Sequence, residues 1–264
     1  MRPDQPHGAA AEHSPHRTAI YRSAPPPEIN EEAATVLLAL ADDEFMMGHR
    51  HSEWLGLSPF LEEDLTTASI GQDELGHAGA LYALIWPSWE LRDADVVRRP
   101  PESWRSCPLT EMAGVPWEKS LIRHWLYDLI EPFRWTSATA AFGASVAGLT
   151  ALAQRVQSEE HFHLAHATAL VQRLGAMDTA RLRLQDALDD VAPAAMALLH
   201  ELSSIDSHRG AAATEAVREA AQRASLMIIH SPGPAMDRRF RDADAEGALR
   251  QFVDVVAFDP DASW

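Results

Sequence analysis

Cysteine, long apolar runs and basic residues are all scarce in this chain. A single cysteine, Cys107, occurs among 264 residues, which excludes an internal disulfide framework and fits a reducing cytoplasm. No apolar run approaches the roughly 20 residues that a membrane-spanning helix requires. Residues 1–30 also lack the continuous apolar core of a signal peptide. We therefore expect a cytoplasmic protein with no membrane partner.

Positive charge is in the minority. The 22 lysines and arginines stand against 39 aspartates and glutamates, which gives a net charge of −17. Phosphate backbones are bound by clustered positive charge, so the composition argues against a nucleic-acid partner. A polyanionic substrate would need a local basic pocket, held against the field of the whole protein.

Hydrophobic periodicity indicates an all-α protein. Apolar residues make up 46% of the chain and recur at helical spacing, and no run alternates in the manner of a strand. We expect a flexible N-terminal segment over residues 1–27 and one helical domain over residues 28–264. The expected helices are 28–55, 59–86 (with Ser58 as N-cap), 117–141 and 147–174 in a core bundle of about 28–175, then 178–204, 211–229 and 243–257 in a C-terminal part of about 176–258. The proline-rich stretch 87–115 joins two helix pairs as one long crossover, which is typical of ferritin-like four-helix bundles.

Two copies of Glu-x-x-His are the most informative motifs. The first is Glu74-Leu75-Gly76-His77 and the second is Glu160-His161-Phe162-His163. Residues three apart share one helix face, so the acid and the histidine of each motif can bind one metal together. A further acid, Glu44, lies 30 residues before Glu74 in a core-like stretch. It is either a metal ligand or a solvent-facing acid beside Asp42 and Asp43.

The second motif has two upstream acids, Asp128 and Glu131, which lie 32 and 29 residues before Glu160. They are three residues apart and share a helix face, so the spacing alone does not choose between them. Four-helix carboxylate proteins build a two-metal site from one acid on each of two helices and Glu-x-x-His on each of the other two. The pattern therefore predicts such a site, with iron or manganese as suitable metals and with dioxygen chemistry.

Several segments resemble the bacterial multicomponent phenylacetyl-CoA epoxidase, a di-iron monooxygenase family of ferritin-like fold. Residues 41–43, 49–56, 58–59 and 61–65 are similar to its structural, non-catalytic subunit, which lacks metal ligands at the positions of Glu44, Glu74 and His77. Residues 72–77, 125–128 and 159–163 instead resemble the catalytic subunit, with its intact ligands. The resemblance covers roughly residues 33–175, whereas the C-terminal third matches poorly.

The resemblance implies a specific set of catalytic residues and partners. It favours Asp128 over Glu131 as the fourth acid, because the catalytic subunit places an aspartate ligand in the segment that Trp125-Leu126-Tyr127-Asp128 resembles. The implied catalytic and metal-binding set is Glu44, Glu74, His77, Asp128, Glu160 and His163, with Glu131 as a further metal ligand. It also implies two iron ions, dioxygen as co-substrate and a small organic substrate, perhaps an aromatic acyl-CoA. No flavin, nicotinamide or iron–sulfur motif is present, so an external reductase is implied, with a companion oxygenase subunit or a homodimer.

Three other interpretations stay open. Besides the oxygenase just described, the chain could be a metal-free structural subunit of such an oxygenase, a ferritin-like iron-oxidising protein, or a manganese or mixed-metal oxidase. The arginine groups Arg98-Arg99 and Arg238-Arg239-Arg241 are most simply solvated loops, and as a second reading they would receive acyl-CoA phosphates.

Overall fold

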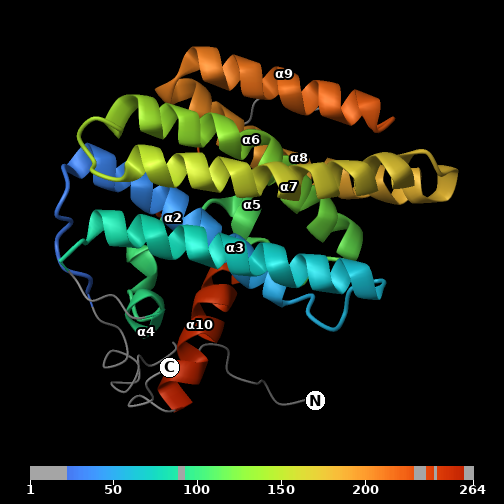
Figure 1. Ribbon diagram of the computed structural model, residues 1–264. Coiled ribbons are helices and arrows are strands. Elements are labelled where there is room, and N and C mark those ends of the chain that lie inside the picture. Colours follow the sequence, from blue (N-terminus) through green and yellow to red (C-terminus); the bar gives the residue numbers. More distant parts are fainter. Residues whose placement is uncertain (1–22, 89–92, 229–235, 241–242, 259–264) are drawn as a thin grey trace, which may run out of the picture.

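Four long helices form the centre of the protein. The computed structural model describes residues 23–88, 93–228, 236–240 and 243–258, and every regular element in these ranges is helical. The bundle consists of α2 (Glu31–Ser52), α3 (Leu61–Ile85), α6 (Trp117–Phe142) and α7 (Leu149–Gly175) (Figure 1). α2 packs along α3, α6 packs along α7, and the pairs meet through contacts of α2 with α6 and of α3 with α7. The prediction of an all-α, ferritin-like bundle is confirmed.

Local sequence sets the ends of these helices. Asn30 caps α2, because its Oδ1 accepts the backbone N–H of Ala33 at 2.8 Å. Gly148 precedes α7 as its N-cap with a φ of 88°, a left-handed conformation that suits glycine. The expected N-cap of α3 is wrong, since α3 begins at Leu61. The Ser58 hydroxyl instead donates to the carbonyl of Trp54 at 3.2 Å, in the preceding turn.

The crossover between the helix pairs contains three short helical pieces. They are α4 (Asp93–Val97), the 3₁₀ turn η1 (Pro101–Ser103) and α5 (Pro108–Glu111). α5 packs against α2, α6 and α8. The crossover therefore covers part of α2, and its arginines meet Asp42 beside Tyr82 of α3.

Three further helices extend the bundle at its C-terminal side. α8 (Asp178–Ile205) packs on α6 and α7, α9 (Ser207–Arg223) packs on α8 and α6, and α10 (Ala243–Phe258) contacts α4 and α5. The predicted helix 211–229 is therefore wrong at both ends. Asp206 starts α9 earlier by accepting the Arg209 backbone N–H at 3.0 Å. Ser225, with a φ of 59°, lies just beyond its end.

Two apolar cores occupy different levels of the bundle. One lies between α6, α7, α8 and α9, and its buried side chains include Trp125, Leu126, Ile130, Val171, Leu188 and Val191. The other lies between α2, α3 and the opposite halves of α6 and α7, and includes Leu37, Leu81, Tyr82, Trp135, Leu149 and Val156. The predicted metal-binding residues occur in sequence where one core gives way to the other. The bundle thus buries a polar layer between two apolar ones.

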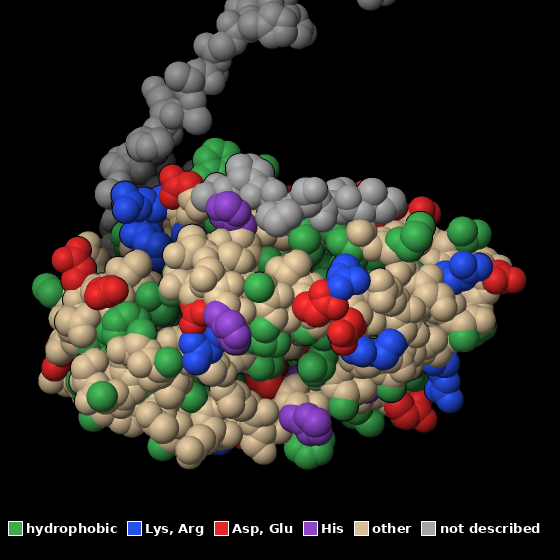
Figure 2. Space-filling view, turned by 90° about the horizontal axis from the view of Figure 1, so that it is seen from above, with side chains coloured by type: hydrophobic (Ala, Val, Ile, Leu, Met, Phe, Trp, Pro, Cys, Tyr) green, Lys and Arg blue, Asp and Glu red, His purple; other side chains and the backbone are tan. Residues whose placement is uncertain are grey.

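The face seen from the α9 side carries charged side chains of both signs. Basic and acidic side chains are interspersed there rather than gathered by sign (Figure 2), and α9 carries the exposed ion pairs Arg218–Glu215 and Arg223–Glu219. Among the described residues, no helix has the length and apolarity that a membrane crossing requires.

Candidate metal centre

Seven acids and histidines from the four bundle helices meet in the polar layer. α2 contributes one of them and each of the other three helices contributes two. All are at most 4% exposed: Glu44, Glu74, His77, Asp128, Glu131, Glu160 and His163. The structure therefore brings every predicted site residue into the interior, although their charges make burial costly.

One half of the cluster is centred on His77. Single ligand atoms of Glu44, Glu74, His77 and Glu160 all lie within 4.8 Å of one another. The Nδ1 atom of His77 is 3.6 Å from Oε2 of Glu44 and 3.3 Å from Oε1 of Glu160. Three different helices thus supply a set of donors that a single cation can hold together.

The other half is centred on His163. Its Nδ1 atom is 3.1 Å from Oε1 of Glu160 and 3.9 Å from Oε1 of Glu74. The centroids of the His77 and His163 rings are 6.4 Å apart. The carboxyl groups of the two Glu-x-x-His motifs therefore lie close to both imidazoles.

The outward nitrogens of the two imidazoles are held by the acid that precedes each motif. Nε2 of His77 is 2.7 Å from Oε2 of Glu159 on α7, and Nε2 of His163 is 3.2 Å from Oδ2 of Asp73 on α3. Each histidine thus uses the acid next to the other motif's glutamate, and its Nδ1 is left facing the cluster. Neither acid was predicted from the sequence. The signal for them is the repeated acidic pair in Asp73-Glu74 and Glu159-Glu160.

Asp128 and Glu131 both reach the cluster from α6, in different settings. Oε1 of Glu131 accepts the indole N–H of Trp135 at 2.5 Å, and its Oε2 has no hydrogen bond in the described part of the chain. Neither oxygen of Asp128 has such a bond, although Nε2 of His124 lies 2.8 Å from Oδ2. Asp128 therefore has the larger uncommitted capacity to bind a cation.

The unpartnered atoms of the cluster fit a pair of cations. Ten of its buried nitrogen and oxygen atoms have no hydrogen-bond partner among the described residues: Glu44 Oε2, both carboxyl oxygens of Glu74, Asp128 and Glu160, Glu131 Oε2, and Nδ1 of His77 and His163. Leaving one buried polar atom unpaired costs about 1–3 kcal/mol. Carboxylate oxygens and imidazole nitrogens are donors for divalent iron and manganese. The residues present thus suit the two metals that the sequence pattern predicts.

The cluster shares protons when it holds no cation. Burial, with the charges of Glu160 and Glu44 added, holds the pKa of Glu74 and of Glu131 well above the usual range. Burial likewise raises the pKa of Asp128, together with the charge of Glu160. Burial also opposes the charge on Glu160, but His163 and His77 lower its pKa to about 2.

The two histidines keep their protons for the complementary reason. Burial alone would lower their pKa, but Glu160 and its acidic neighbours raise the pKa of His77 to about 10 and that of His163 to about 9. Several protons must therefore leave before cations occupy the cluster, since metal-bound imidazole and carboxylate are deprotonated.

A family model described as phenylacetic acid catabolic protein matches residues 20–227. The chain belongs to this family. The matched range contains all seven cluster residues and ends between α9 and the segment 236–240. No curated protein matches the chain. The phenylacetic acid catabolic family connects the protein with phenylacetate breakdown, and its membership confirms the resemblance drawn from the sequence.

In this family member, three successive acids of α2 are all fully buried: Asp42, Asp43 and Glu44. Successive residues point about 100° apart around a helix, so each acid faces a different neighbour. Asp42 accepts hydrogen bonds from Tyr82 at 2.6 Å and from the Arg105 backbone N–H at 2.6 Å. Only Glu44 faces the cluster, where the Tyr127 hydroxyl donates to it at 3.3 Å.

The prediction of solvated arginine loops is wrong for the residues that the structure describes, Arg239 excepted. Arg98, Arg99 and Arg238 are buried or nearly so, whereas Arg239 is exposed and Arg241 lies outside the described residues. Arg99 is paired with Asp42 at 2.5 Å. The cause is the buried acid run of α2, whose charges need cations next to them. Arg99 is therefore a poor candidate for acyl-CoA phosphates.

Proposed function

We propose that this protein is the oxygen-activating, di-iron subunit of an oxygenase that acts on a small organic substrate. The convergence of both Glu-x-x-His motifs, with each Nδ1 facing shared carboxyl groups at 3.1–3.9 Å, is the observation that carries the proposal. Membership of the phenylacetic acid catabolic family supports it. When bound, two ferrous ions would supply electrons for the reduction of dioxygen.

The residues divide into two overlapping ligand sets. Glu44, Glu74, His77 and Glu160 would hold one ion. Glu74, Glu160 and His163 would hold the other together with Asp128, and Glu131 lies beside them as the alternative. Glu159 and Asp73 would orient the two imidazoles through Nε2, as carboxylates commonly do behind metal-binding histidines.

The chain's other role is to keep the centre dry and to leave electron supply to a partner. The two apolar cores enclose the cluster on both levels, and water exclusion strengthens the electrostatic interactions inside. Because no motif for a redox cofactor is present, we expect an external reductase and a companion subunit or second copy. A cytoplasmic location would suit the single, buried cysteine.

The test combines metal analysis with product analysis. Full-length protein is loaded with ferrous iron without oxygen, and bound metal is counted by mass spectrometry, beside a matched manganese-loaded sample. A chemical reductant and ¹⁸O₂ are then added with phenylacetyl-CoA or free phenylacetate as substrate, and ¹⁸O is sought in the product.

Four results separate the interpretations. About two irons per chain with ¹⁸O in the product supports the proposal. No bound metal would identify a structural subunit. Iron that is oxidised without oxygenated product would favour a ferritin-like iron-oxidising protein. Turnover with manganese alone would favour the manganese oxidase. The double variant His77→Ala/His163→Ala is the control and should bind no iron while keeping its helicity.

A further inference from the structure

A cavity of about 490 Å³ lies beside α2 and α6 on the side that faces α8. Its walls are mainly apolar, formed by Val36, Leu40, Ala138, Ala141, Phe142 and Leu202. Small-molecule sites are typically concave, about 300–1,000 Å³ in volume, and apolar apart from a few polar groups. The cavity is thus large enough for a compact organic molecule.

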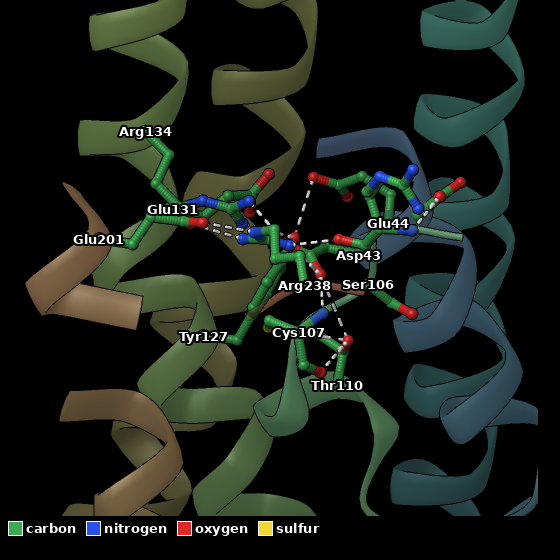
Figure 3. A network of polar contacts seen from close by, with 12 residues as sticks. Asp43, Glu44, Ser106, Cys107, Thr110, Tyr127, Glu131, Arg134, Glu201 and Arg238 are labelled. Carbon is green, nitrogen blue, oxygen red and sulfur yellow. Dashed lines mark hydrogen bonds and ion pairs between the residues drawn. The ribbon is translucent and has the colours of Figure 1, made fainter. Parts of the chain in front are cut away.

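One end of the cavity is built from arginines that carboxylates hold in place. Arg134 of α6 and Arg238 converge on Asp43 of α2 (Figure 3), at 2.5 Å for Arg134 and at 3.0 and 3.1 Å for Arg238. Arg238 also donates to both carboxyl oxygens of Glu201 on α8, at 2.6 and 2.7 Å. The guanidinium groups are therefore fixed before any ligand arrives, which lowers the entropic cost of binding.

The charges around the cavity are balanced. Arg105, Arg134, Arg238 and Arg239 line it together with the acids Glu32, Glu201 and Asp237, and the buried Asp43 pairs with two of these arginines. The whole chain carries −17, so an anion meets less repulsion here than the average charge of the chain would give. The planar donors of arginine match a carboxylate in geometry as well as in charge.

Arg134 is also connected to a residue of the predicted metal-binding cluster. Nη1 of Arg134 donates to the Tyr127 hydroxyl at 3.3 Å, and that hydroxyl donates to Oε1 of Glu44 at 3.3 Å. Asp43, which accepts from Arg134, is also the neighbour of Glu44 in the chain. Any shift of Arg134 toward a ligand in the cavity would change the hydrogen bonding of Glu44.

We propose that this cavity binds a compact organic monocarboxylate with an apolar body, and that Arg134 and Tyr127 transmit its binding to Glu44. The site is separate from the cluster, because the Asp43–Arg134–Tyr127 layer lies between them. The binding part holds with or without metal, whereas the transmitted part rests on the proposed metal centre. Tyr127 acts here as a positioning residue.

Binding is tested on the full-length, metal-free protein by calorimetric titration with 3-phenylpropionate and with the uncharged analogue 3-phenylpropan-1-ol. We expect the carboxylate to bind about tenfold or more tightly than the alcohol, as hydrogen bonds to charged groups are the stronger ones. Ala141 is an exposed residue of the cavity wall, so Ala141→Trp should fill the cavity and abolish binding. Arg239→Gln should weaken the carboxylate several-fold.

The matched control is Ala165→Trp, the same substitution at an exposed position of α7 outside the cavity, which should leave binding unchanged. Equal affinity for the alcohol, binding that survives Ala141→Trp, or no carboxylate binding at millimolar concentration would each overturn the proposed site.

Transmission is tested with Co²⁺ as a spectroscopic probe of the cluster. Saturating 3-phenylpropionate should shift the visible absorption bands of the cobalt-loaded protein. Tyr127→Phe should remove that shift while the carboxylate affinity stays within about twofold of the parent. Unchanged bands at saturation would overturn transmission. A protein that binds the carboxylate but no cobalt would overturn both transmission and the proposed metal centre, and would leave the carboxylate site standing.

Discussion

Nε2 of His77 lies 2.7 Å from Oε2 of Glu159, although the two residues are 82 positions apart in the chain. The reciprocal contact, between His163 and Asp73, spans 90 positions at 3.2 Å. Together they join α3 to α7 across the cluster and fix which nitrogen of each ring faces inward. Because each imidazole is held by the acid beside the other motif, the two halves of the centre depend on one another.

We predict that Glu159→Gln and Asp73→Asn each weaken metal binding about 10- to 100-fold, the usual effect of removing a partner behind a metal-binding histidine. The amide keeps the size of the side chain but loses the negative charge that stabilises the ring in its metal-binding orientation. Competition titration with a coloured chelator measures the affinity for Co²⁺.

The control for this pair is Glu62→Gln, an exposed acid in the first turn of α3. It should leave the cobalt affinity unchanged, because Glu62 does not reach the cluster. Affinities of Glu159→Gln and Asp73→Asn equal to that of this control would show that the two acids do not orient the histidines.

The fourth carboxylate ligand can be identified by comparing Asp128→Asn with Glu131→Gln. Neither oxygen of Asp128 has a hydrogen bond in the described chain, although His124 lies beside Oδ2, whereas Glu131 already accepts from Trp135. We expect Asp128→Asn to bind about one metal per chain instead of two, and Glu131→Gln to bind nearly two. Metal counting of both purified variants decides. A single metal in Glu131→Gln, with two in Asp128→Asn, would reverse the assignment.

The helices and the seven cluster residues were predictable because they depend on local spacing. Helical periodicity, Asn30 at a helix start and Glu-x-x-His on one face are all properties of short segments. α9 was misplaced because its start depends on the Asp206 side chain, and its predicted end at 229 ran past Ser225.

What the sequence could not provide is the pairing of distant charges. Asp43 meets Arg238 across 195 positions, and nothing local marks either as buried. Asp42 and Asp43 suggest a solvated acidic turn on a helix surface, since adjacent acids rarely all find partners. Only the enclosure of α2 by the crossover, α6 and the segment 236–240 makes both of them buried. The cavity beside α2 depends on the same packing and has no sequence signal.

Metal stabilisation should increase with pH. The raised pKa values of Glu74, Glu131, Asp128, His77 (about 10) and His163 (about 9) mean that these five groups hold more protons in the folded, metal-free protein than in the unfolded chain. Its stability from these groups is fully present below the pKa values of the unfolded chain and is lost as pH rises toward those of the folded state. Metal ions displace these protons, so the stabilisation by bound metal also grows as pH rises.

Thermal unfolding with and without Mn²⁺ at pH 5.5, 6.5 and 7.5 measures this effect. We expect the difference in Tm between loaded and metal-free protein to rise at each step. A difference independent of pH would mean that the cluster binds its metal without releasing protons. The variant His77→Ala/His163→Ala should show no Mn²⁺-dependent difference at any of these pH values.

Asp43 should be among the most important single residues for stability. Its carboxylate is fully buried and accepts from Arg134, Arg238 and the backbone N–H of Cys107 at 2.6 Å. Removing one partner of a buried charge network costs about 3–5 kcal/mol, because the remaining charges stay desolvated without compensation. We therefore expect Asp43→Asn to lower the free energy of unfolding in urea by about that amount, while Glu215→Gln, which breaks an exposed pair on α9, should change it by less than about 1 kcal/mol. A similarly small loss for Asp43→Asn would mean that Arg134 and Arg238 are satisfied without it, and that the layer between the cavity and the cluster is held together by Glu201 and the backbone carbonyl groups instead.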